Sequence, residues 1–376
     1  MRPIAFIPLI FLAITYPATA ASPSYKQSAS PSYPKYPTTP PETHFQGTCD
    51  NDPDGTKFAE KACYTKFGNP GDSGFAPRYR PPTCDKSKPL TQEQKAILAK
   101  AYSRAPDYMK GKLCRLTQLF VTRSQWWGPM GWGFWEGPDR LPGSKSVYVA
   151  ISDRQLTSKQ SFLDVENQTI RDLLRADYPG KGKGLVQLKM GAVPEPELAV
   201  LAELGHELGH ALVADANMDG INRDHPRRKV SGPPRNACFE SAFIQTSWDE
   251  KLFNKRLQRW VDFGEQYGNR AKNPDLRFSL ERLRQDVRRG KFEAANRLIG
   301  DVVSSKEFVS FAAAINPLED VVETYKYKVL ADVMGSQKAG FDLDGRAINV
   351  FDNLDSGVLQ KKVQCLRDFG FLSGQP

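Results

Sequence analysis

Histidine is scarce in this chain of 376 residues, which contains four histidines, at positions 44, 206, 210 and 225. A chance pair at metal-ligand spacing is therefore rare. After residue 20, no apolar run approaches the length of a membrane span, so we expect no stable membrane insertion of the mature protein. No block of five or more basic residues occurs, although the net charge is +9. This pattern favours a solvated basic surface over a nucleic-acid-binding stripe.

The cysteines contain no Cys-x-x-Cys pair, which argues against zinc ligation and for disulfides. They are Cys49, Cys63, Cys84, Cys114, Cys238 and Cys365. The sequence does not fix how they pair. The first four fall within residues 46–125, which we expect to form a loop-rich, cross-linked N-terminal part.

The N-terminus has the organisation of a secretory signal over residues 1–20. Arg2 supplies the positive charge, a short apolar stretch follows, and Ala18-Thr19-Ala20 is a small-x-small cleavage site. Residues 21–45 are rich in Ser, Pro and Tyr and predict a linker. We therefore expect a secreted or periplasmic protein whose domain covers residues 46–376.

The most informative motif is His206-Glu207-Leu208-Gly209-His210. Histidines four residues apart leave the same face of a helix, so both can bind one metal ion. The intervening glutamate, Glu207, can then take a proton from a water bound to a zinc ion. The alternative is an ordinary amphipathic helix that carries this pattern by chance.

The surroundings of the motif predict a buried helix. Leucines recur at three- and four-residue spacing, at Leu198, Leu201, Leu204, Leu208 and Leu212. Pro196 marks the start of this helix, and residues 215–220 form a polar, glycine-terminated end. Gly205 and Gly209 each cost about 1 kcal/mol of helix propensity. Their presence predicts a close approach there, by a substrate or by packed backbone.

A catalytic zinc ion needs a third protein ligand. Asn316-Pro317 predicts the start of a second helix, on which Glu319 and Glu323 share a face. One carboxylate would bind zinc while the other holds a ligating histidine. A capping-box role would also explain Glu319, but not Glu323.

These two motifs together resemble the gluzincin metallopeptidases, in particular the anthrax lethal factor and Pro-Pro endopeptidase group and related uncharacterised secreted proteins. The resemblance covers about residues 184–335, which would form the metal-site core. It implies that Glu319 is the third zinc ligand and that Glu323 supports a histidine. It also implies an α+β, zincin-like catalytic domain, mainly helical with a small mixed sheet.

Two features depart from this family or compete with its pattern. The family has a tyrosine seven residues before the ligating glutamate, where this chain has Ala312; Tyr325, Tyr327 or a residue of the basic loop at 223–235 could substitute. Glu240 is the alternative third ligand, but it has no acidic residue four positions later.

Several other segments carry weaker signals. The acidic run Asp50–Gly55 could bind calcium but lacks the closing glutamate, so a polar turn is the favoured interpretation. Residues 126–135 are rich in aromatics and glycine and predict neither a helix nor a strand. Residues 91–120 show a helical pattern, and residues 146–151 and 184–188 read as strands.

The sequence therefore predicts a secreted zinc metalloendopeptidase, a hydrolase acting on a protein or peptide substrate. Zn²⁺ would be held by His206, His210 and Glu319, with Glu207 as general base. The alternatives are a secreted binding or effector protein on a degraded protease fold, and a peptidase acting on cell-wall crosslinks.

Overall fold

The computed structural model describes segments between residues 45 and 372. The described residues are 45, 49, 51–65, 84–122, 131–136, 145–157, 159–174, 184–185, 188–189, 195–216, 237–249, 269, 271–335, 340–343 and 346–372. The predicted signal peptide, the predicted linker up to residue 44 and the basic loop at 223–235 lie outside these residues. Phe45, the last residue of the predicted linker, is described and has a buried side chain.

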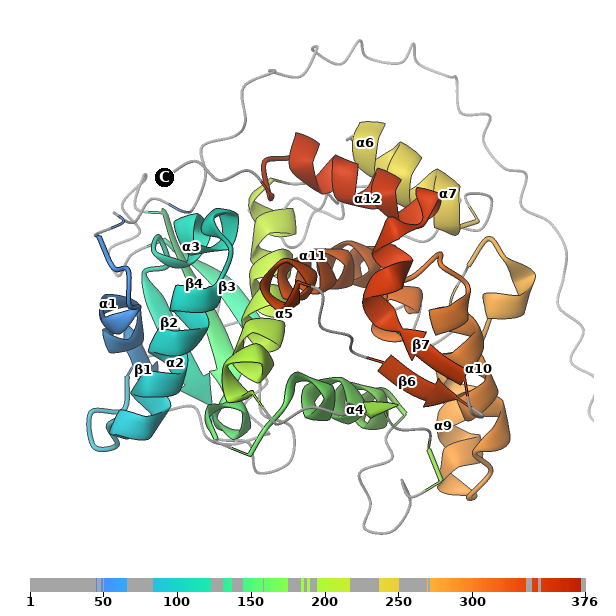
Figure 1. Ribbon diagram of the computed structural model, residues 1–376, viewed down its shortest axis with the longest axis horizontal. Helices are drawn as coiled ribbons and strands as arrows, with labels where there is room; N and C mark the ends of the chain where they lie inside the picture. Colours follow the sequence, from blue (N-terminus) through green and yellow to red (C-terminus); the bar gives the residue numbers. More distant parts are fainter. Residues whose placement is uncertain are drawn as a thin grey trace, which may run out of the picture. The chain divides into compact units, whose positions relative to one another are not determined.

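The described part of the chain is mainly helical (Figure 1). Its α-helices are α1 (Thr56–Glu60), α2 (Gln92–Arg104), α3 (Asp107–Leu113), α4 (Phe162–Leu173), α5 (Pro196–Asp215), α6 (Ala237–Phe239), α7 (Gln245–Ser247), α9 (Leu280–Arg288), α10 (Glu293–Ser304), α11 (Pro317–Met334) and α12 (Gly357–Asp368). A π-helical segment, η2 (Glu240–Ile244), joins α6 to α7, and short 3-10 segments are η1 (Asp153–Leu156), η4 (Pro274–Leu276), η5 (Ala312–Ala314) and η6 (Val350–Asp355).

Side-chain caps explain where several of these helices begin. Thr91 and Ser161 accept hydrogen bonds from the backbone N–H groups of Gln94 and Asp164, and both complete a capping box. Ser356 accepts from the backbone N–H of Leu359 at the start of α12. Each cap satisfies an N–H group that the first turn of a helix leaves without a partner.

Four strands form one sheet in the order β1-β2-β4-β3. They are β1 (Ala62–Tyr64), β2 (Gln118–Thr122), β3 (Gly131–Glu136) and β4 (Lys145–Ser152). β1, β2 and β4 run parallel, and β3 pairs antiparallel with β4. All five residues of β4 from Val147 to Ile151 are buried, as expected for a strand that is covered on both faces. The expectation of a mainly helical protein with a small sheet is confirmed.

A second sheet is antiparallel and has the order β5-β6-β7. Its strands are β5 (Leu188–Lys189), β6 (Gly340–Leu343) and β7 (Arg346–Asn349). It brings the segment just before α5 beside the segment that follows α11. Of the described residues in the strand expected at 184–188, Gly184 and Leu185 lie outside any strand and Leu188 begins β5.

Two expectations from the sequence need correction. The helical pattern over residues 91–120 is interrupted after Arg104, because Ala105 precedes Pro106 and adopts an extended conformation; it resumes as α3 and ends at Leu113. Residues 118–122, with β-branched and aromatic side chains, instead form β2 between β1 and β4. Residues 131–136 also form a strand, since six consecutive positions pair with β4 despite two glycines.

Helix α5 lies between the four-stranded sheet and α11 (Figure 1). It contacts β3, β4, α2 and α4 as well as α11. All five leucines of the predicted stripe are buried, as expected, at Leu198, Leu201, Leu204, Leu208 and Leu212. The His-Glu-x-x-His motif is therefore carried by a helix that is packed on several sides.

All six cysteines form disulfides. The pairs are Cys49–Cys114, Cys63–Cys84 and Cys238–Cys365. The first two cross-link the N-terminal part, and the third joins α6 to α12. None of the helices in the described residues is both long and apolar enough to cross a membrane.

Candidate metal centre

Helices α5 and α11 bring three potential metal ligands together. His206 and His210 come from α5, and Glu319 comes from the first turn of α11. One ligand atom from each lies within 4.8 Å of the others. The two Nε2 atoms are 3.2 Å apart, and they lie 3.8 and 3.5 Å from the nearer Glu319 oxygens. This group could hold a metal ion.

The spacing and burial of these atoms suit zinc. Tetrahedral zinc with bonds of about 2.0–2.1 Å separates its ligand atoms by about 3.4 Å, close to the separations seen here. The three side chains are partly exposed, at 22% for His206, 14% for His210 and 21% for Glu319. The three side chains are therefore accessible to solvent.

The start of α11 fixes the position of Glu319. Asn316 accepts hydrogen bonds from the backbone N–H groups of Leu318 and Glu319, both at 2.9 Å, and Pro317 occupies the first turn. The predicted cap is confirmed. Glu319 lies in the first turn, where a carboxylate is also favoured by the helix dipole.

Two glycines of α5 allow it to pack closely against α11. A Cβ atom at Gly205 would lie 3.4 Å from the Cα of Lys326. A Cβ atom at Gly209 would lie 3.2 and 3.3 Å from the Cγ1 and Cα of Val322. The sequence predicted that either a substrate or packed backbone approaches these glycines. In the structure it is the packed backbone of α11 that does so. The glycines set the separation between the helix with the histidines and the helix with Glu319.

These distances predict different outcomes for alanine at the two glycines. In Gly205→Ala the added Cβ atom makes an ordinary van der Waals contact, and the helix gains up to about 1 kcal/mol of propensity. Gly209→Ala gains the same propensity but presses on the backbone of Val322, so we expect it to be about 1–3 kcal/mol less stable than Gly205→Ala. Denaturant unfolding of both variants measures the difference, and equal stabilities would contradict this account of the packing.

Glu207 lies beside His206 with its carboxylate buried, at 5% exposure. Burial raises the pKa of Glu207 to about 7 in the metal-free site; the charge of His206 opposes this rise and the charge of Glu319 adds to it. A carboxylate with such a pKa can accept and return a proton near neutral pH.

Glu323 holds His206 from the side away from Nε2. Its Oε1 lies 2.7 Å from Nδ1 of His206. Burial disfavours a charged imidazole, but the hydrogen bond to Glu323 and the charge of Glu319 outweigh burial and raise the pKa of His206 to about 9 in the metal-free site. Glu323 is itself fully buried, yet the charges of Lys326 and His206 keep its pKa well below its usual value.

Further polar side chains, which the motifs did not indicate, support Glu323. Its Oε2 accepts hydrogen bonds from Ser310 Oγ at 2.6 Å and Lys326 Nζ at 2.7 Å. Lys326 also donates to Glu166 of α4 at 2.6 Å. Lys326 follows Glu323 by three residues on one helix, a spacing that could have indicated this pair. Ser310 and Glu166 carry no such local signal.

The other candidate residues lie apart from this group. Glu240 begins η2 and does not belong to the cluster of ligand atoms formed by described residues. Tyr325 and Tyr327 are buried, at 1% exposure each, and the Tyr327 hydroxyl donates to Glu166. Neither tyrosine reaches solvent as a substrate-binding group would. Ala312, at the position of the family's tyrosine, is buried in η5.

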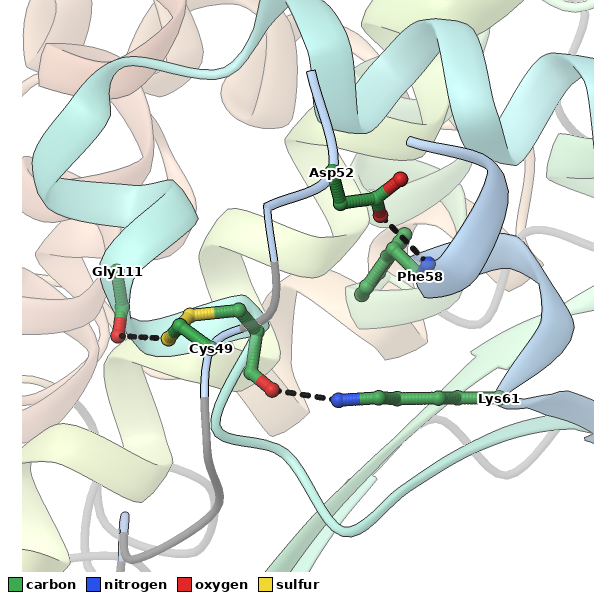
Figure 2. The surroundings of a disulfide bond; sticks show 6 residues. Cys49, Asp52, Phe58, Lys61 and Gly111 are labelled. Carbon is green, nitrogen blue, oxygen red and sulfur yellow. Dashed lines mark hydrogen bonds between the residues drawn. A yellow bond between two sulfur atoms is a disulfide. The ribbon is translucent and has the colours of Figure 1, made fainter. Parts of the chain in front are cut away.

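The described part of the acidic run near the N-terminus, residues 51–55, forms a turn that caps α1. Asp52 accepts hydrogen bonds from the backbone N–H groups of Lys57 and Phe58 at 3.1 and 2.8 Å, and Asp54 accepts from Thr56 at 3.0 Å. Figure 2 shows Asp52 pointing to α1 near the Cys49–Cys114 disulfide. These contacts agree with the polar-turn interpretation. Of the polar end predicted at residues 215–220, positions 217–220 lie outside the described residues.

In comparisons with known proteins, no family model, no curated protein and no solved structure matches this chain. The functional argument therefore rests on the geometry of the His206, His210 and Glu319 group.

Proposed function

We propose that this protein is a secreted zinc-dependent endopeptidase with a zincin-like α+β domain of the gluzincin type. The observation that carries the proposal is the convergence of His206, His210 and Glu319, with Glu207 beside the first histidine. Two histidines and one glutamate form one of the ligand sets of catalytic zinc, which leaves a position open for water or substrate.

The residues of this site would have separate roles. His206, His210 and Glu319 would hold the metal, and Glu323 would orient His206. Zinc in such a site acts as a Lewis acid that activates water for attack on a carbonyl group. Glu207 would accept the proton of that water and pass it to the leaving amine.

The proposed compartment follows from the disulfides and the N-terminal sequence. The protein has three disulfides. Disulfides persist in oxidising environments and are rare in the cytosol. The signal-like residues 1–20 agree with export.

A peptide substrate suits the sheet that flanks α5. Strand β3 contacts α5 and, within the described residues, pairs on one side only, with β4. An extended peptide can add to such an edge through backbone hydrogen bonds. The substrate would therefore lie along β3 with its scissile bond near the exposed side of His206, His210 and Glu319.

Metal content provides the direct test. We expect the purified mature protein to contain about one zinc ion per chain, and His206→Ala to lose it, because a catalytic zinc site needs three protein ligands. Elemental analysis after dialysis measures the content. A wild-type protein that folds but retains no zinc would refute the proposal.

One observation favours a second candidate, a binding or effector protein built on a protease fold. Ala312 stands where the family has its tyrosine, and Tyr325 and Tyr327 are both buried. A third candidate is a peptidase that acts on cell-wall crosslinks. Incubation with casein, gelatin and purified peptidoglycan separates the three: an endopeptidase cuts the proteins, a cell-wall peptidase cuts only peptidoglycan, and a binding protein cuts none.

A further inference from the structure

We propose that Lys326 is a positioning residue of the metal site, which locks the Glu323 carboxylate toward His206 and is itself held in place by Glu166. This inference rests on the proposed zinc site. It assigns a role to two buried groups that neither bind the metal nor contact the substrate.

The two oxygens of Glu323 are used for different purposes. Oε1 lies 2.7 Å from Nδ1 of His206, while Oε2 accepts from Lys326 at 2.7 Å and from Ser310 at 2.6 Å. With two donors on Oε2, the carboxylate cannot rotate without losing both hydrogen bonds. Oε1 therefore stays on Nδ1, which keeps the proton on that nitrogen and leaves the Nε2 lone pair for a metal.

Lys326 is fixed from the opposite side. Its ammonium group lies between Glu323 and Glu166, at 2.7 and 2.6 Å, and Tyr327 donates to the other Glu166 oxygen at 2.9 Å. Its backbone packs against Gly205 of α5, one residue before His206. A chain of contacts thus runs from α4 through Lys326 and Glu323 to the imidazole of His206.

A purely structural role accounts poorly for these groups. Glu166, Glu323 and Lys326 have exposures of 3, 0 and 2%, so each pays a large desolvation cost. Apolar residues of similar volume often give equal or greater stability at such positions. What apolar residues cannot do is present a fixed carboxylate oxygen to a histidine.

The same helix supplies a matched comparison. Asp320 of α11 pairs with Lys362 of α12 at 2.7 Å, and both side chains are fully buried. Asp320 also accepts from the indole of Trp248 at 3.1 Å. No histidine takes part in these contacts, so this pair reproduces the burial and charge of the Glu166–Lys326 pair away from the imidazoles.

The experiment compares two double variants. Glu166→Gln/Lys326→Met removes the ion pair between Glu166 and Lys326, here called the clamp. It keeps the net charge, because it deletes one positive and one negative group. Asp320→Asn/Lys362→Met does the same for the comparison pair. Zinc affinity is measured by competition with a chromophoric chelator. Thermal unfolding of the metal-free proteins is measured in parallel, and histidine-selective NMR follows the Nδ1–H proton of His206, assigned with His206→Ala.

We expect Glu166→Gln/Lys326→Met to weaken zinc binding about 10–100-fold and to alter the Nδ1–H signal. The comparison variant should keep wild-type zinc affinity and signal even if its unfolding temperature falls. Wild-type affinity in the first variant, or an equal loss of affinity in both, would overturn the role of Lys326.

Ser310→Ala provides an independent test if the first double variant does not fold. It removes the other donor to Oε2 and should weaken zinc binding relative to wild type and change the Nδ1–H signal; no change in either would overturn the proposal. A wild-type protein without zinc would instead refute the metal site itself. Zinc bound by wild type and lost in His206→Ala, but retained in the clamp variant, would leave the proposed function standing and refute this inference alone.

Discussion

Glu207→Gln is expected to keep zinc and thermal stability while losing hydrolysis by about 10²–10⁴-fold. Glutamine has the shape of glutamate but cannot accept the proton of the attacking water. Glu207 is not one of the three grouped residues His206, His210 and Glu319, so the variant should still bind the metal. Because burial already disfavours the charged carboxylate, neutralising it costs little folding energy. Rates with a protein substrate, zinc content and thermal unfolding together measure the effect.

Glu203→Gln is the matched control for this experiment. Glu203 lies one turn earlier on α5, is buried at 2% exposure, and accepts a hydrogen bond from the backbone N–H of Ser152 at 2.7 Å. Glutamine can keep that bond, so hydrolysis should continue. A Glu207→Gln protein as active as wild type on every substrate would end the protease proposal.

Glu319→Ala is expected to lower zinc affinity and hydrolysis together, and by more than the roughly 10–100-fold typical of a residue that only supports a ligand. A ligand is needed both to hold the metal and to perform the chemistry, whereas a general base is needed only for the latter. Chelator competition and substrate turnover on the same preparation measure both effects.

Glu240→Ala tests the alternative third ligand. The Glu319 oxygens lie 3.8 and 3.5 Å from the two imidazole nitrogens, and Glu240 lies in η2 outside that group. We therefore expect Glu240→Ala to bind zinc like wild type. If it lost zinc while Glu319→Ala kept it, the ligand assignment would be wrong, although a metalloprotease could still be correct.

Local patterns predicted the elements that carry the site. The leucine stripe and Pro196 indicated α5, and Asn316-Pro317 indicated the start of α11. The sequence indicates these elements because a helix cap and a helical repeat each involve residues that lie within one or two turns of one another. The glycines Gly205 and Gly209 also indicated a close approach.

The sequence could not indicate contacts made between distant segments. Glu166 lies 160 residues before Lys326, and no local spacing joins them. The backbone that fills the space beside Gly209 belongs to Val322 of another helix. Residues 131–136 form a strand because β4 pairs with them, which overrides the poor strand propensity of their glycines. Pairing partners, rather than composition, decide such segments.

None of the three disulfides joins the two ligand-bearing helices directly to each other. Cys49–Cys114 and Cys63–Cys84 precede α5, and Cys238–Cys365 closes a loop that contains α11. Helix α5 lies outside all three disulfide loops, so zinc held by both helices would be a removable cross-link between α5 and the Cys238–Cys365 loop. Removal of zinc by a chelator would then weaken the packing of α5 against α11 while all three disulfides stay intact. The metal would therefore stabilise the fold as well as supply the chemistry.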